Sequence, residues 1–392
     1  MSFIPRCISK LHKNLTPIIG SGSYVFDNKG NSYLDMTSGI GALSLGHSHP
    51  IINSYVKKQM NNIIHVPQQV YKSNVQLDKL NEVLYSTMPN ASLNQFFFVN
   101  SGSEATDNAI KIARNYNKRN NILAFKGGFH GRTLGALSIN SSNVFSKANS
   151  GPLMPGVFYC DPFNLESLDN VFTLYTSPED TCCVIFESVQ GEGGIYDIPV
   201  EFIKKLRDIC KKNDILIIAD EVQCGAMRTG IMWDISSKIN NPDIITFGKG
   251  IANGYPLAGV ATTTQIMEQM SQGILGGTYG GNAMVCAAGY KTLEILSNSD
   301  LQIHKKSSIL KSNLEVIEGI KEVRNSGLMM AIELEDPILT KQLVTSLSNN
   351  GVLVLTAKHD SSIIRLLPPL NISIDEIEKF LEIFSNVFID IQ

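Results

Sequence analysis

The sequence predicts an α/β protein: a mostly parallel central sheet with helices on both faces, plus a smaller α+β domain. Three observations lead to this prediction. The middle of the chain alternates short apolar runs with helices of amphipathic spacing, the first part reads as a hairpin, and the C-terminal part mixes helices with short strands.

The alternating middle part supplies the strands of the predicted sheet. Each strand is a short apolar run bounded by polar or glycine residues. Helical spacing occurs at 103–117 and 199–213, and Pro199 suits a first helical turn, which leaves its N–H groups unbonded. The expected strands are 96–99, 122–125, 182–186, 215–219, 244–247 and 259–262.

The two ends of the chain form the predicted smaller domain. Residues 24–26 and 32–34 flank Asp27-Asn28-Lys29-Gly30-Asn31, a sequence typical of a hairpin turn. From Ala283 we expect a long helix to about Ser297, another helix, and short strands such as 329–334 and 363–366. The expected division is an N-terminal segment that joins the small domain, 1–45, a large domain, 46–288, and a C-terminal small domain, 289–392.

The composition indicates small-molecule chemistry. The chain has 392 residues, 43% of them hydrophobic, and a formal net charge of -3 without a Lys/Arg tract. This charge balance does not indicate binding to nucleic acid or to an anionic membrane. No stretch of the sequence approaches the roughly 18 consecutive apolar residues of a membrane span. No metal site is predicted.

The cysteines favour a reducing compartment. They form no C-x-x-C pair and lack the dense spacing of a disulfide scaffold. Neighbouring Cys182 and Cys183 lie in an apolar run, and we interpret them as small core residues. We expect a cytoplasmic location. The alternative is a mitochondrial one, because the first residues, MSFIPRCISKLHKN, are basic and contain no acid.

Polar and glycine-rich residues follow four of the expected strands. In open α/β sheets a ligand binds outside the carboxyl ends of the strands, so these residues should face one crevice. They are 100–104, Glu187, Asp220 with Glu221, and Gly248-Lys249-Gly250.

The segment Ser101-Gly102-Ser103 is a candidate phosphate site. It opens a helix, where free backbone N–H groups and the helix dipole favour an anion. The alternative is a plain N-cap. Neither G-x-G-x-x-G nor G-x-x-x-x-G-K-[ST] occurs in the chain, which argues against dinucleotides and triphosphates and leaves a single phosphate.

Lys249 and Asp220 are the candidate catalytic residues. Lys249 lies between two glycines directly after an apolar strand, where desolvation and a nearby cation would lower its pKa, as an imine-forming lysine requires. Asp220 follows the apolar run 215–219, and a carboxylate at that depth needs a cationic partner such as a protonated pyridine nitrogen. The alternatives are a turn lysine in solvent and an aspartate paired with an arginine.

Six motifs occur in the order typical of one family. They are NSGSEATDNAIKIAR (100–114), GGFHGRT (127–133), ESVQGEGG (187–194), ADEVQCGAMRTG (219–230), FGKGIANGYPLAG (247–259) and GGTYGGN (276–282). With these motifs the chain resembles the class III (ω-amino) aminotransferases from about Tyr24 to Pro369. The resemblance implies pyridoxal 5'-phosphate (PLP) as cofactor, fold type I of the PLP-dependent transferases, and a homodimer with shared active sites.

The resemblance also implies which residues contact the cofactor. Lys249 would carry PLP as a Schiff base, and Asp220 would pair with the ring nitrogen. For the two expected ring-face residues taken alone, core packing is the simpler interpretation. The further implied contacts are Gly102, Ser103 and, from the neighbouring subunit, Thr278 for the phosphate, Phe129 and Val222 for the ring faces, and Gln223 for the phenolic oxygen.

Two arginines are implied as the substrate-binding residues. Arg132 matches the residue that binds the carboxylate distant from the reacting amine, and Arg365 matches the binder of the α-carboxylate. Glu192 would pair with Arg365 when no such carboxylate is bound. Ile40 stands where ornithine enzymes usually have a tyrosine. The alternative for Arg365 is an exposed strand face.

The expected reaction moves an amino group from an ω-amino acid to a 2-oxo acid such as 2-oxoglutarate by a ping-pong mechanism. The leading donor is 4-aminobutyrate, because Gly276-Gly277 precede Thr278 where acetylornithine enzymes usually have His-Ser. Acetylornithine, then alanine or β-alanine, are the alternative donors. An aminomutase, which usually has methionine in place of Gln223, and an inactive scaffold of the same fold are the alternatives from other classes.

Overall fold

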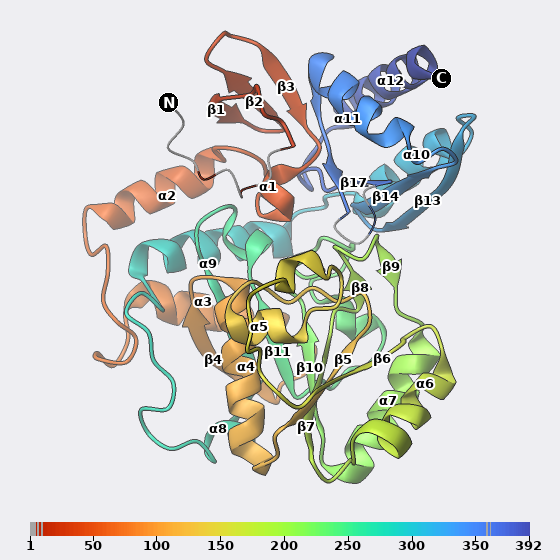
Figure 1. The fold of residues 1–392 in the computed structure, drawn as a ribbon. Coiled ribbons are helices and arrows are strands. Elements are labelled where there is room, and N and C mark those ends of the chain that lie inside the picture. The colour runs from red at the N-terminus through yellow and green to blue at the C-terminus, as the bar shows by residue number, and fades with distance from the viewer. Residues whose placement is uncertain (1–4, 6–7, 9–10, 358–359, 361) are drawn as a thin grey trace.

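The computed structural model describes residues 5, 8, 11–357, 360 and 362–392. In Figure 1 a large sheet with its helices lies below, and smaller sheets with further helices lie above it. Residues 1–4, 6, 7, 9 and 10 lie outside the described residues, and Cys7 is one of them. The basic segment at the start of the chain is therefore described only in part.

A seven-stranded sheet forms the centre of the larger part. Its strand order is β4-β12-β11-β10-β7-β5-β6, and β12 is antiparallel to both of its neighbours while the other pairs are parallel. All six expected strands are present, and the sequence did not predict β6. The bounds are β4 (Leu93–Val99), β5 (Asn121–Phe125), β6 (Val157–Cys160), β7 (Thr181–Phe186), β10 (Leu216–Asp220), β11 (Ile244–Phe247) and β12 (Ala258–Thr263).

Helices cover both faces of this sheet. On β10, Ile218 belongs to an apolar cluster with α4 (Gly102–Asn117), whereas its neighbour Ile217 belongs to a cluster with α7 (Val200–Asn213). Because both faces are buried, the strands read as continuous apolar runs. Pro199 was expected in the first turn of α7, but the structure places it at the N-cap, one residue before the helix.

The other elements of the larger part are short or lie at its edge. Two of them, β8 and β9, form a separate two-stranded sheet. The bounds of all these other elements are α2 (Pro50–Met60), α3 (Val75–Thr87), α5 (Leu134–Ile139), α6 (Leu165–Asn170), α8 (Thr264–Met267), β8 (Val189–Gln190), β9 (Tyr196–Asp197), η1 (Phe145–Lys147), η2 (Val171–Tyr175), η3 (Asp234–Ser237) and η4 (Lys249–Ala252).

Two four-stranded sheets form the smaller part, with the orders β1-β2-β3-β15 and β13-β14-β17-β16. The expected hairpin is present as β2 and β3, and β15 runs parallel to β3, so the two ends of the chain share a sheet. The bounds are β1 (Pro17–Ser21), β2 (Tyr24–Asp27), β3 (Ser32–Asp35), α1 (Ser38–Gly41), α10 (Ile303–Leu314), β13 (Ile320–Ser326), β14 (Met329–Leu334), α11 (Leu339–Asn349), β15 (Val352–Leu353), β16 (Leu355–Thr356), β17 (Ile363–Leu366) and α12 (Ile374–Ile391).

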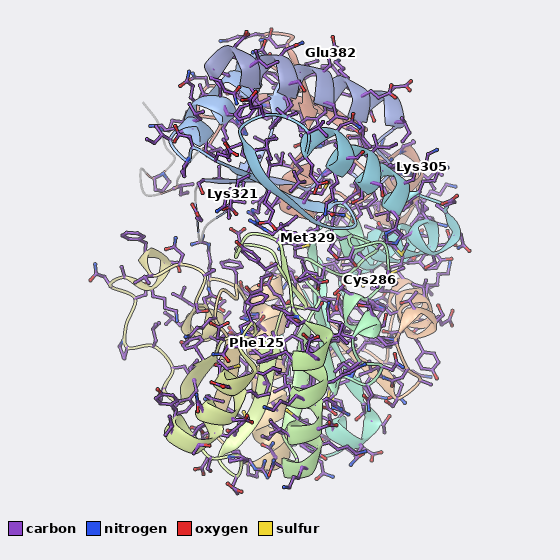
Figure 2. The ribbon with its side chains drawn as sticks, turned by 90° about the vertical axis from the view of Figure 1, so that its right-hand side faces the viewer. Phe125, Cys286, Lys305, Lys321, Met329 and Glu382 are labelled. Atoms are coloured by element: carbon purple, nitrogen blue, oxygen red, sulfur yellow. The ribbon has the colours of Figure 1, made fainter. Side chains whose placement is uncertain are left out.

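A small apolar cluster joins the two parts. Val189 and Cys224 of the larger part lie in it with Met329 and Ile363 of the smaller part. Figure 2 shows Met329 at this junction. Helix α9 (Ala283–Asn298) contacts α2 and α3 and spans residue 288, and the domain boundaries at 45 and 288 stay a prediction.

The described cysteines are all free and buried, and Cys182 and Cys183 lie in the core as expected. No helix of the described residues is long and apolar enough to cross a membrane. The same part of the chain holds no group of three or more His, Cys, Asp or Glu residues that could bind a metal ion.

Candidate active site

The carboxyl ends of β7, β10 and β11 meet at one edge of the central sheet, where the three strands are parallel neighbours. Asp220 ends β10, Glu187 follows β7, and Lys249 follows β11 by two residues. The structure therefore brings these three side chains together, as parallel strand ends predict.

The amine of Lys249 lies in this crevice without a partner. The side chain is half-buried, and it makes no hydrogen bond or salt bridge with any residue that the structure describes. Burial lowers the pKa of Lys249, while the charges of Glu187, Glu192 and Asp220 act in the opposite direction. A larger fraction of this amine is therefore uncharged at neutral pH than in an ordinary lysine, as a nucleophile requires.

The carboxylate of Asp220 is buried and held by three donors. His130 Nδ1 lies 2.6 Å from Oδ2, and Oδ1 accepts from the backbone N–H of Val222 and from Thr246 Oγ1, both at 3.1 Å. Since a carboxylate only accepts, Nδ1 of His130 carries the proton of this bond. No arginine of the described residues pairs with Asp220, and the sequence did not predict His130 as its partner. The three donors fix the orientation of this carboxylate.

Helix α4 begins beside these residues. Ser101 is its N-cap and accepts from the N–H of Glu104, while the N–H groups of Gly102 and Ser103 make no hydrogen bond to a described residue. A Cβ on Gly102 would lie 2.7 Å from Cγ1 of Val222, so the close approach of Val222 requires glycine here. Two free N–H groups at the start of a 16-residue helix are suited to an anion.

The expected ring-contacting residues surround the same crevice. Phe129 is half-buried, and its N–H donates to Oε1 of Glu187 at 2.9 Å. Gln223 is buried, with neither its amide nitrogen nor its amide oxygen bonded to a described residue. A Cβ on Gly191 would lie 1.7 Å from Oε1 of Gln223, so this amide lies directly against the Gly191 backbone.

Arg365 and Glu192 form a buried ion pair. Arg365 is 2% exposed, and its Nη2 lies 2.8 Å from Oε1 of Glu192. Nη1 donates to the Gly191 carbonyl at 3.2 Å and Nε donates to the Thr356 carbonyl at 3.3 Å. The alternative of an exposed arginine on β17 is therefore wrong. Oε2 of Glu192 is buried and has no hydrogen-bond partner among the described residues, so the pair is joined through one oxygen only.

The structure does not bring every expected residue into the crevice. Thr278 is exposed, in the loop between α8 and α9, and no hydrogen bond joins it to the residues above. Arg132 is exposed, with its guanidinium 5.8 Å from the Phe129 ring centroid, and its N–H donates to Ser103 Oγ at 3.0 Å. Ile40 is 47% exposed on α1.

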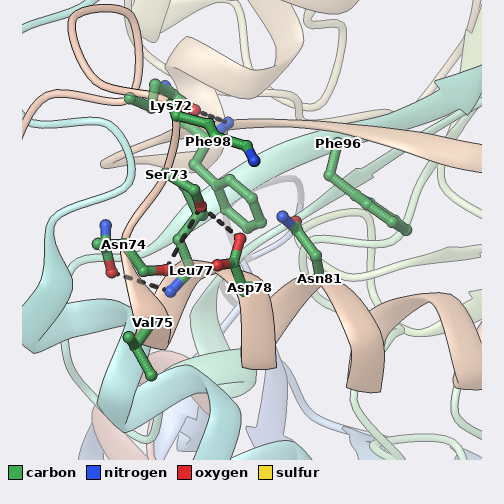
Figure 3. Close-up of a pocket in the computed structure, with 10 residues that line it drawn as sticks. Lys72, Ser73, Asn74, Val75, Leu77, Asp78, Asn81, Phe96 and Phe98 are labelled. Atoms are coloured by element: carbon green, nitrogen blue, oxygen red, sulfur yellow. Dashed lines mark hydrogen bonds between the residues drawn. The ribbon is translucent and has the colours of Figure 1, made fainter.

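A separate cavity of about 580 Å³ lies next to the Thr278 loop (Figure 3). Its walls come from the start of α3 and from β4, including Asn81, Phe96 and Phe98. Asn74 Nδ2 donates to the carbonyl of Gly281 at 3.1 Å, which ties this wall to the loop. None of the expected site residues lines the cavity.

Comparisons with known proteins agree on one family. The protein-family model described as aminotransferase class-III matches residues 9–388 of this chain. The chain is 34% identical to the acetylornithine aminotransferase of Caldanaerobacter subterraneus subsp. tengcongensis, covering 95% of this chain and 94% of that protein. It is also 34% identical to the 4-aminobutyrate aminotransferase GabT of Escherichia coli, covering 98% and 96%. A transaminase structure from a marine Virgibacillus has a TM-score of 0.93 at 26% identity, covering 99% of this chain and 97% of that one.

The fold and the site thus define a transaminase of fold type I. The chain belongs to the class III aminotransferases, and its cofactor is PLP. The described residues fit that cofactor. They offer an unpartnered amine, a carboxylate held by three donors, two free N–H groups at a helix start, and the unbonded amide of Gln223.

Proposed function

We propose that this aminotransferase takes the amino group of an ω-amino acid, with 4-aminobutyrate as the leading donor, and passes it to 2-oxoglutarate. The buried pair of Arg365 and Glu192 is the observation that carries the proposal, since it lies close enough to Lys249 to act on its pKa. A donor without an α-carboxylate leaves the pair closed, whereas glutamate needs the pair open.

Lys249 and Asp220 are the proposed catalytic residues. When bound, PLP supplies a ring that accepts the electron pair released as the donor carbon loses its proton. Lys249 would hold the cofactor, and its uncharged Nζ would take the proton from the donor carbon. Asp220 would pair with the ring nitrogen, and the hydrogen bond from His130 would keep this carboxylate oriented.

The remaining cofactor contacts are proposed from the positions of the side chains around the crevice. The free N–H groups of Gly102 and Ser103 would bind the phosphate. Phe129 and Val222 would cover the two faces of the ring, and the unbonded amide of Gln223 would reach the phenolic oxygen.

Substrate carboxylates are assigned to the two arginines. Arg365 would bind the α-carboxylate of glutamate, with Glu192 moving aside. The link through a single oxygen of Glu192 supports this role, because one charged contact is easier to break than a bidentate one. Arg132, with its exposed guanidinium, would bind the distant carboxylate. The apolar side chain of Ile40 offers no partner for a free α-amino group.

We further propose a homodimer in which Thr278 reaches the cofactor phosphate of the neighbouring subunit. The exposure of Thr278 supports this assignment. Several large apolar side chains near the Thr278 loop are exposed, as at many protein–protein interaction sites. These side chains include Ile63, Ile64, Val70, Tyr71 and Tyr279.

The donor is tested by single-turnover bleaching of the visible cofactor band with separate donors. Rapid bleaching by 4-aminobutyrate and by glutamate is expected. A faster reaction with N-acetylornithine would favour the acetylornithine alternative. The acetylornithine and 4-aminobutyrate relatives are equally similar to this chain, at 34% identity each, so similarity alone does not choose between the two donors. Turnover without any 2-oxo acid acceptor would indicate an aminomutase, and the absence of a cofactor band would indicate an inactive scaffold.

A further inference from the structure

Glu187 is a buried carboxylate that joins two loops of the candidate site. It is 5% exposed and accepts two backbone hydrogen bonds, Oε1 from the N–H of Phe129 at 2.9 Å and Oε2 from the N–H of Gly191 at 3.1 Å. Each oxygen is therefore used by a different loop. Neither bond depends on the side chain of its donor residue.

These two bonds complete a continuous path from Arg365 to Phe129. Nη1 of Arg365 donates to the carbonyl of Gly191, and the N–H of Gly191 donates to Glu187. Glu187 in turn holds the N–H of Phe129, and the next residue, His130, holds Asp220. Glu187 thus binds both the loop under Arg365 and the loop that carries the expected ring-facing residue, and Gln190 adds a second link between them through its bond to the Lys126 carbonyl.

A carboxylate at this place is costly, so its presence calls for a reason. Burial raises the pKa of Glu187 to about 7, with the charge of Asp220 acting in the same direction, while His130 and the two backbone donors lower it. Glutamine would avoid a buried charge, but it has a single acceptor oxygen and would turn its NH2 group toward one of the two N–H donors. Only a carboxylate accepts from both loops.

We propose that Glu187 is a positioning residue that holds Arg365 and the Phe129 loop in register, so that dicarboxylate binding and cofactor binding both depend on it. This inference rests on the proposed function, because that function assigns Arg365 to the substrate and Phe129 to the cofactor. Glu187 itself is required to touch neither ligand.

The test compares Glu187→Gln with a matched control, Glu221→Gln. Glu221 is also buried and also accepts two backbone hydrogen bonds, from Asp234 at 3.0 Å and from Ile235 at 2.6 Å. Burial raises the pKa of Glu221 too, to about 8. Its two donors belong to η3, and Glu221 accepts no hydrogen bond from Phe129, Gly191 or another member of the path between Arg365 and Phe129 that the structure describes. The two variants therefore remove the same kind of group and differ in what the group holds.

Three quantities are measured for both variants: the dissociation constant of PLP from the apoprotein, the dissociation constant of glutarate from the holoenzyme, and the melting temperature. Substitutions along a coupled network change binding by about 2- to 30-fold, and Glu187→Gln should weaken both ligands within that range. Glu221→Gln should lower the melting temperature about as much as Glu187→Gln does. It should change each dissociation constant by less than about twofold.

The proposal is overturned if Glu187→Gln leaves either constant unchanged, or if Glu221→Gln weakens both ligands equally. If Glu187→Gln does not fold, Glu187→Asp replaces it: the shorter side chain keeps the charge but can satisfy one loop at most, and unaltered binding of both ligands would again overturn the proposal. Both dissociation constants are measured at equilibrium, so neither measurement requires turnover. A wild-type protein that binds PLP but does not react with any ω-amino donor would refute the proposed function, while the effect of Glu187→Gln on PLP would still be measured.

Discussion

Replacing Arg365 by methionine should leave the carboxylate of Glu192 buried without any partner. The two side chains are largely buried and 2.8 Å apart, and no residue that the structure describes bonds to the other oxygen of Glu192. Breaking a buried pair by removing one partner costs about 3 to 5 kcal/mol, because an uncompensated charge remains. Adding Glu192→Gln to Arg365→Met should restore most of that loss, since the double variant buries no charge at this place.

The same variants separate the two half-reactions. A lost charged contact is worth about 1.5 to 3 kcal/mol, so Arg365→Met should slow the glutamate half-reaction at least about tenfold and spare a 4-aminobutyrate-like donor. Urea unfolding gives the stabilities of the wild type, both single variants and the double variant, and single-turnover kinetics give the rates. Equal losses for both donors, or a double variant as unstable as Arg365→Met, would refute the reasoning.

Three further predictions concern stability and cofactor binding. Because burial raises the pKa of Glu221 to about 8, the folded chain binds this proton more tightly than the unfolded chain, and Glu221 should lower the free energy of unfolding as pH rises from 4.5 to about 8. Glu221→Gln should remove a slope of up to about 1.4 kcal/mol per pH unit in urea titrations at several pH values, and an unchanged slope would contradict this. Gly102→Ala would place a Cβ 2.7 Å from Val222 Cγ1, so PLP affinity should fall, and Val222→Ala in the same chain should recover part of that loss although it also removes a ring contact; no recovery relative to Gly102→Ala would count against the close approach. Thr278→Ala should weaken PLP about 10- to 150-fold, as for one lost hydrogen bond to a charged group, and a fully active monomer in sedimentation would exclude the shared site.

The central sheet was predictable because its strands are buried on both faces. Runs such as 215–219 are apolar at every position, and turn residues mark their ends. The short strand β6 was missed although its residues, Val157-Phe158-Tyr159-Cys160, are all apolar or aromatic, because periodicity alone does not identify so short a run as a strand. The meeting of Glu187, Asp220 and Lys249 followed from parallel strand ends alone.

Other parts of the site depend on contacts between residues far apart in the sequence. Arg365 and Glu192 are 173 residues apart, and only the family resemblance joined them before the structure did. His130 is 90 residues from Asp220, and no local pattern distinguishes it from an ordinary core histidine.

The central claim is that Lys249 is the residue that holds the cofactor and moves the proton. Borohydride reduction of the purified yellow protein, followed by peptide mapping, tests it most directly. We expect a single reduced PLP adduct on Lys249, and we expect Lys249→Ala to lose both the adduct and turnover while keeping the wild-type fold by circular dichroism. An adduct on another lysine, or trapping that persists in Lys249→Ala, would contradict the account.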